Sequence, residues 1–298
     1  MDIELIIHSF DAGALSQLRA VAKALRDKNH KVIGRVTFEP GDAERFTWEA
    51  VQRGADLVFA AGGDGTLNEV ANVLATATPP DGGKEPPALG IVPLGTANDF
   101  ANWVGIPMDP IEAVLAAVEA EPRRIDLAKV NDRYFLNVST GGFGAAATEQ
   151  APERAKRTLG VLAYVITGLK KFAALEPCNA RFTADGEVIH EGEFMLFAVG
   201  NGQQTGGGNL LTPNSSLHDG LLDFCLVKAL THSEFLRLAP GLRSGAHIES
   251  EHVLYRQVPK LLVEATSELS VNADGEPIPS NCFLYEAAPK CLRIALPS

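Results

Sequence analysis

Residues 57–70 read LVFAAGGDGTLNEV, and this stretch decides the fold. The first five residues are apolar and predict a buried strand. Leu67, Val70 and Leu74 recur at helical spacing and predict a helix directly afterwards. The segment therefore predicts a strand, a glycine-rich turn and a helix, which is the repeating unit of α/β proteins.

The glycine-rich turn, residues 62–66, has the features of a phosphate-binding loop. Glycines let backbone N–H groups approach a ligand that a Cβ would exclude, and a helix N-terminus favours negative charge. Thr66 can cap the helix or donate to a phosphate oxygen. Asp64 would repel phosphate unless Mg²⁺ lies between them or the carboxylate accepts a ligand hydroxyl. Because no GxxxxGK[ST] motif is present, the alternative is a tight turn without a ligand.

The segments around this turn predict two different kinds of sheet. Apolar runs predict further strands at 3–7, 32–37 and 88–92, and helices fill the gaps, one of them opening at Asp109-Pro110. Such alternation predicts a parallel sheet with helices on both faces. After residue 126, short strand candidates separated by turn signals predict an antiparallel β domain, interrupted by helices near 158–173 and 231–242.

A second polar loop, PLGTANDF at residues 93–100, follows the fourth predicted strand. Ligands of open α/β sheets bind at the carboxyl ends of the strands, so both loops are expected at one edge of the same sheet. The alternative is that Thr96 and Asn98 only cap a helix.

Composition excludes several classes of protein. The 298 residues are 46% apolar and 21% charged, as in globular proteins of one large or two ordinary domains. A net charge of -11 argues against nucleic-acid binding. The four cysteines lack zinc spacing and fit a reducing compartment. We expect no signal peptide and no membrane-spanning run, and hence a cytoplasmic protein.

Six motifs, taken together, resemble the diacylglycerol-kinase catalytic family, and their order and spacing are similar to those of its bacterial YegS-type lipid kinases. They are GGDGTLNE at 62–69, PLGTANDFA at 93–101, TGGFGA at 140–145, GNG at 200–202, DGLLD at 219–223 and DGEP at 274–277. The resemblance implies a Rossmann-like nucleotide-binding domain over 1–126, completed by 287–298. An antiparallel β-sandwich domain would occupy 127–286, with ATP bound between the two.

The resemblance also implies site residues. ATP would be bound by Thr37, Gly62, Gly63, Asp64, Gly65, Thr66, Leu67, Asn68, Glu69, Gly95, Thr96 and Asn98. Glu276 would accept the proton, with Asp274 beside it, although Asp-Gly alone predicts only a hairpin. Mg²⁺, or another divalent ion such as Ca²⁺, would bind Asp219 and the carbonyls of Ser216 and Leu221. Many relatives carry an NPxSG-like loop after the first strand, where this chain has His8-Ser9-Phe10-Asp11.

The expected activity is transfer of the ATP γ-phosphoryl group to a hydroxyl of a lipid such as phosphatidylglycerol or diacylglycerol. The lipid would be reached transiently at a membrane surface. The basic, apolar segment 154–171 is one candidate for docking there, with a buried core helix as the alternative. Rival functions are a kinase of a soluble acceptor, such as NAD, and a nucleotide-binding regulator without turnover. The sequence leaves the assembly open between a single chain and a homodimer.

Overall fold

The computed structural model describes residues 1–8, 12–78, 85–142 and 177–297. Within them the chain forms two compact units. Unit 1 comprises residues 1–126 and 290–298, and unit 2 comprises residues 127–289. The predicted order, an α/β part followed by an antiparallel β part, is confirmed.

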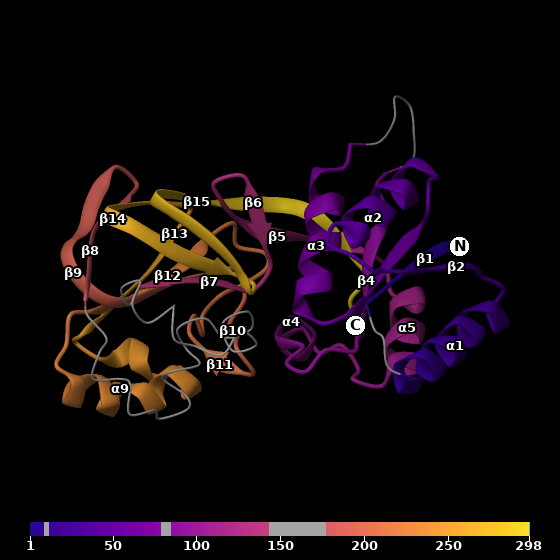
Figure 1. Ribbon diagram of the computed structural model, residues 1–298, viewed down its shortest axis with the longest axis horizontal. Coiled ribbons are helices and arrows are strands. Elements are labelled where there is room, and N and C mark those ends of the chain that lie inside the picture. The colour runs from indigo at the N-terminus through magenta and orange to yellow at the C-terminus, as the bar shows by residue number, and fades with distance from the viewer. Residues whose placement is uncertain (9–11, 79–84, 143–176, 298) are drawn as a thin grey trace. The chain divides into compact units, whose positions relative to one another are not determined.

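Unit 1 is built from strands that alternate with helices (Figure 1). Its elements are β1 (Asp2–Ile7), α1 (Ala12–Asp27), β2 (Lys31–Val36), α2 (Asp42–Gln52), β3 (Leu57–Gly62), α3 (Asp64–Thr76), β4 (Ala88–Pro93), α4 (Asp99–Trp103) and α5 (Pro110–Glu119). The strands are parallel and lie in the order β4-β3-β1-β2. Asp109 caps α5 by accepting hydrogen bonds from Ile111 N and Glu112 N, and Pro110 occupies the first turn, as the sequence predicts.

Alternation along β1 separates the two faces of this sheet. Ile3, Leu5 and Ile7 pack with residues of α1 and α5 in one apolar core. Glu4 points to the opposite face, where it contacts Arg53 at the end of α2. The helices α2 and α3 pack against each other. Both faces of the sheet are therefore covered, and the predicted site residues of this unit lie at strand ends, in loops and near the N-terminus of α3.

Unit 2 is built almost entirely of antiparallel strands. They are β5 (Arg123–Val130), β6 (Arg133–Phe135), β7 (Val138–Gly142), β8 (Cys178–Ala184), β9 (Glu187–Gly200), β10 (Gln204–Thr205), β11 (Asn209–Leu210), β12 (Leu222–Lys228), β13 (Val253–Val258), β14 (Lys260–Ala273) and β15 (Glu276–Ile294). The helices are α9 (His232–Ser244) and the short η2 (Ala246–Glu249). The strands enclose an aromatic core that includes Phe182, Phe197, Phe224 and Tyr285.

Two long strands connect the layers of unit 2. Along β9 and β14, the first half pairs with β8 and the second half pairs with β7. The sequence predicts each as two short strands, because apolar alternation breaks in the middle. In the structure each is continuous, and β14 has a register shift between Glu264 and Leu269. Strand β13 was not predicted, whereas β15 follows the predicted Asp274-Gly275 turn and ends in the segment, 287–298, that the resemblance assigns to the first domain.

The last strand, β15, begins in unit 2 and ends in unit 1, where Ile294 pairs in parallel with Leu89 of β4. The predicted helix at 158–173 lies outside the described residues. No described helix is both long enough and apolar enough to cross a bilayer.

Candidate functional site

The two polar loops of unit 1 lie in contact at the carboxyl edge of its sheet. Leu94 N donates to Gly62 O at 2.9 Å, which continues the pairing of β3 with β4 past the strand ends. A Cβ placed on Gly95 would come within 2.4 Å of Gly63 Cα. Only glycines allow this approach, so the closeness of the two loops, predicted from strand order, has a steric cause.

Asp64 connects the two loops through its carboxylate. Its oxygens accept hydrogen bonds from Asp99 N at 3.2 Å and Phe100 N at 3.3 Å, the first residues of α4. Burial and, after it, the neighbouring Asp99 carboxylate raise the pKa of Asp64. Asp64 is partly buried and Asp99 is buried, and their two carboxylates form a set of oxygen donors that suits a hard cation such as Mg²⁺. The sequence reasoning missed Asp99, although it lies within the PLGTANDF motif.

Asn98 closes the second loop on itself. Its backbone is left-handed, with φ of 49°, and its side chain both accepts from Gly95 N and donates to Gly95 O, each at 2.9 Å. Asn98 therefore fixes the shape of the loop. It also occupies the N-cap position of α4, but its side chain makes no capping hydrogen bond there. Thr96, the neighbouring predicted ligand, is exposed.

The N-terminus of α3 faces this junction with a glycine, Gly63, as its N-cap. Thr66 lies inside the first turn, and its side chain is close to Gly62. A Cβ added to Gly62 would be 2.6 Å from Thr66 Oγ1. Further along the predicted run, Leu67 and Asn68 are buried side chains of α3, while Glu69 is partly exposed. An N-terminus with no side-chain cap keeps its N–H groups for an anion.

Thr37 follows β2 and lies at the same edge of the sheet. Its N–H donates to Ile7 O at 2.9 Å, and its hydroxyl lies 2.9 Å from Nδ1 of His8. His8 N in turn donates to Ala61 O at 2.9 Å, next to the glycine loop. His8, the residue that follows β1, therefore lies together with Thr37 in the structure.

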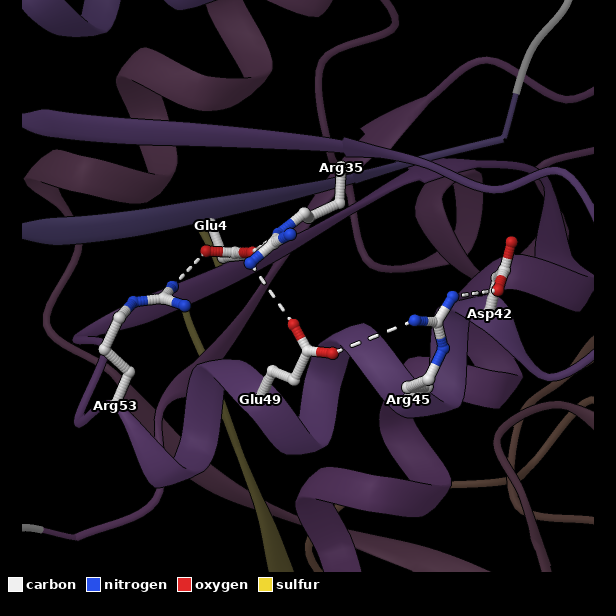
Figure 2. Close-up of polar contacts among 6 residues, drawn as sticks. All are labelled: Glu4, Arg35, Asp42, Arg45, Glu49 and Arg53. Atoms are coloured by element: carbon white, nitrogen blue, oxygen red, sulfur yellow. Dashed lines mark hydrogen bonds and ion pairs between the residues drawn. The ribbon is translucent and has the colours of Figure 1, made fainter.

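A network of charged residues fixes the segment that carries Thr37 (Figure 2). The fully buried Glu4 pairs with Arg53 and, at 3.2 Å, with Arg35. Arg35 also pairs with Glu49 of α2 at 3.2 Å, so the network ties β1 and β2 to that helix.

The network continues into the loop between β2 and α2. Asp42 accepts from Phe38 N at 2.9 Å and from Arg45 at 2.5 Å. The Phe38 N–H and then the Arg45 guanidinium lower the pKa of the Asp42 carboxyl. The loop after Thr37 is therefore held at both of its ends.

In unit 2, the Asp274-Gly275 turn joins β14 to β15 as predicted. Asp274 is left-handed, with φ of 48°, and Gly275 has φ of 94°. The Asp274 carboxylate accepts hydrogen bonds from three consecutive backbone N–H groups, those of Leu136 at 2.6 Å, Asn137 at 3.1 Å and Val138 at 3.2 Å. These contacts anchor Asp274 to residues 136–138, and the catalytic role predicted for it stays a prediction. Glu276, the other predicted catalytic residue, is exposed at the start of β15.

The predicted metal site precedes β12. Asp219 is exposed and its Oδ1 accepts from Leu221 N at 3.0 Å, while Ser216 Oγ accepts from His218 N at 3.3 Å. Among the described residues, no group of three His, Cys, Asp or Glu side chains is arranged to hold a metal. A cation here would need the backbone carbonyls of Ser216 and Leu221 and additional oxygens to complete its shell.

Asp223 lies four residues after Asp219 and does not face solvent. It is fully buried, and it accepts from Tyr255 Oη at 2.5 Å and from Gln257 Nε2 at 3.2 Å. Burial raises the pKa of its carboxyl. Asp223 therefore supports the end of the sheet from inside, and its partners on β13 were not predicted.

Comparisons with known proteins cover nearly the whole chain. Residues 6–130 match the diacylglycerol kinase catalytic domain, and residues 137–296 match the YegS C-terminal NAD kinase beta sandwich-like domain. A protein of Pseudomonas aeruginosa named "Probable lipid kinase YegS-like" is 41% identical, over 99% of this chain and 94% of its own. A Serratia proteamaculans protein of the same name is 42% identical, and the match covers 98% of this chain and 93% of that protein.

A solved structure has the same fold. The crystal structure of a protein described as a diacylglycerol kinase from Bacillus anthracis superposes with a TM-score of 0.78 at 27% sequence identity. The match covers 99% of this chain and 96% of the other.

Proposed function

Because this chain belongs to the family of the diacylglycerol kinase catalytic domain, we propose that it is an ATP-dependent lipid kinase. It transfers the γ-phosphoryl group of ATP to a hydroxyl of a lipid. The observation that carries the proposal is the junction of the two loops of unit 1. There, a helix N-terminus without a side-chain cap, the partly buried Asp64 and the buried Asp99 lie together at the carboxyl edge of a parallel sheet.

We propose that the phosphates of ATP bind at the N-terminus of α3. The glycines at 62, 63 and 65 let the backbone approach the phosphate oxygens, and the free N–H groups of the first turn donate to them. Thr66 and Thr96 supply hydroxyl groups, and Thr37 and His8 border the site. Gly95 and Asn98 keep the second loop against the first.

The metal requirement follows from the charges. Mg²⁺ supplies charge neutralisation for the phosphates when it is bound. Asp64 and Asp99 would hold it, because the two neighbouring carboxylates repel one another and a cation relieves that repulsion. A second divalent ion would be held by Asp219 with the carbonyls of Ser216 and Leu221.

Glu276 is the proposed proton acceptor for the lipid hydroxyl. A carboxylate is a weak base for an alcohol, so it takes the proton as the new P–O bond forms. Glu276 stands directly after a turn that is fixed by Asp274, which holds the backbone at the start of β15. Phosphatidylglycerol or diacylglycerol is the proposed acceptor, reached from the cytoplasm at a membrane surface. The four free thiols support a reducing compartment.

The test is transfer of labelled phosphate from γ-labelled ATP and Mg²⁺ to micellar lipids, with NAD as a soluble acceptor in parallel. Glu276→Gln is expected to lower lipid labelling by about 10²- to 10⁴-fold. The chain offers a matched control, since the tetrapeptide Ala-Asp-Gly-Glu occurs both at 273–276 and at 184–187. Glu187→Gln, in the second copy, should keep full activity. Labelling of NAD alone, or equal loss in both variants, would reject the proposal.

A further inference from the structure

The two Ala-Asp-Gly-Glu turns of unit 2 have the same backbone conformation. Asp185 and Gly186 have φ of 52° and 81°, close to the 48° and 94° of Asp274 and Gly275. In each turn the alanine pairs with the glutamate across the hairpin. The tetrapeptide alone therefore specifies the hairpin, and any difference between the two turns comes from their surroundings.

The surroundings differ at the aspartate. Asp185 is exposed, and among the described residues no hydrogen bond reaches its carboxylate. The Asp274 carboxylate accepts from three consecutive N–H groups of residues 136–138, the nearest at 2.6 Å. Because the first turn forms without such bonds, those at Asp274 serve to fix where the second turn sits relative to β7.

Asn201 holds the segment that binds Asp274. Its N–H donates to Asn137 O at 2.9 Å, and its side-chain Nδ2 donates to Leu136 O at 2.9 Å. The next N–H, of Gly202, also donates to Asn137 O, at 2.8 Å. Hydrogen bonds thus connect Asn201 to residues 136–138 and connect those residues to Asp274. Glu276 follows Asp274 two residues later in the chain.

The two asparagines of this path each have a buried side-chain oxygen. Asn137 and Asn201 are 4% and 1% exposed, and within residues 1–8, 12–78, 85–142 and 177–297 the side-chain oxygen of each finds no hydrogen-bond partner. Burial removes the hydrogen bonds of an acceptor to water, and without a protein partner this loss lowers the free energy of unfolding. Their presence together, on the path to the turn, points to a role other than stabilising the fold.

We propose that Asn201 is a positioning residue of the reaction, which fixes the location of the Glu276 carboxylate through residues 136–138 and Asp274. The proposal rests on the proposed role of Glu276 as proton acceptor. Asn201 contacts neither nucleotide nor lipid in this scheme, so its loss affects the rate of transfer and leaves ATP affinity intact.

Asn201→Leu tests this, with Asn209→Leu as its control. Asn209 is equally buried, at 4% exposure, and its Nδ2 also donates to backbone carbonyls, those of Thr205 and Gly206, but it lies in the β10–β11 hairpin off the path. Asn201→Leu should lower kcat by about 10- to 100-fold with KM for ATP within about threefold, as small displacements of a reacting group do. Asn209→Leu should change kcat less than about threefold.

The decisive readout is the same substitution in the Glu276→Gln background. With the positioned group already gone, Asn201→Leu should change the residual rate by less than about twofold, because two residues that act as one unit are not additive. The same fold loss in both backgrounds, or an equal loss of kcat in Asn209→Leu, would overturn the proposal. If Asn201→Leu does not fold by circular dichroism, Asn201→Asp replaces it, since it has nearly the same volume and loses the donor to Leu136.

A separate measurement keeps this inference apart from the proposed function. If the wild-type protein labels no lipid, the proposed function fails. Hydrogen exchange of the amides of residues 136–138 then tests, without an activity assay, whether Asn201 anchors this segment. Faster exchange in Asn201→Leu than in Asn209→Leu supports it, and equal exchange refutes it.

Discussion

Gly95→Ala is the sharpest test of the loop junction in unit 1. The added Cβ would lie 2.4 Å from Gly63 Cα and 2.8 Å from Asn98 Oδ1. Because non-bonded carbon atoms make contact at about 3.5 Å, the two loops must separate by about 1 Å. The first contact is with backbone, which cannot rotate away as a side chain does. Forced backbone shifts of this kind cost about 1–3 kcal/mol of folding stability.

The separation should weaken function more than it weakens folding. A misplacement of about 1 Å costs on the order of 100-fold in rate, so kcat/KM for ATP should fall by about 10- to 100-fold. Isothermal titration with MgATP measures the loss of ATP affinity, and steady-state kinetics measure the loss of kcat. Gly34→Ala is the matched control, because its Cβ would be 3.4 Å from the nearest atom, Ile7 Cδ1, which is ordinary contact.

The reasoning would be refuted by a folded Gly95→Ala protein whose ATP affinity and kcat both stay within about threefold of wild type. It would also fail if Gly34→Ala lost as much activity as Gly95→Ala. Either result would mean that the closeness of the two loops does not matter for nucleotide binding.

Three further predictions concern charged groups. Burial raises the pKa of Asp64 above its unfolded value of about 3.9, so stability is lost as the pH rises through the raised pKa. Asp64→Asn should therefore melt higher than wild type at pH 7, with the difference shrinking toward pH 4 in scanning calorimetry, while activity is lost. Changing Arg35 and Arg53 together to Met leaves Glu4 buried without a cation and should cost about 3–5 kcal/mol in urea unfolding, with each single change costing much less. Mg²⁺ alone should raise the melting temperature of wild type more than that of Asp219→Asn, which keeps only the site at Asp64 and Asp99, and an equal shift in both would place the second ion elsewhere.

Much of the fold could be predicted because local signals agree with the final structure. The apolar run before Gly62 and the Asp109-Pro110 start of α5 each determine an element by themselves. The long strands β9 and β14 were harder, because each changes its pairing partner midway from β8 to β7. Periodicity in a short window does not reveal that two short apolar segments belong to one strand with two successive partners.

The candidate site likewise has features that the sequence predicts and features that it does not. Loops that follow adjacent parallel strands could be placed at one edge from the strand order alone, and the structure brings Gly63 and Gly95 together there. What sequence could not predict are contacts between residues far apart in the chain. Asp274 was paired with Glu276 as a catalytic residue because the two are neighbours in sequence, whereas its contacts lie with residues 136–138. Tyr255 was missed because an aromatic residue in a short strand gives no sign of a carboxylate partner.

The return of β15 to unit 1 has a consequence for synthesis on the ribosome. Its end pairs with β4, whose six residues are all buried. During translation, β4 emerges roughly 200 residues before the segment that covers it, so the nascent sheet has an open, apolar edge for many seconds at ordinary elongation rates. We therefore expect truncated chains that end before residue 290 to aggregate or to recruit chaperones, although they contain every proposed nucleotide-binding residue.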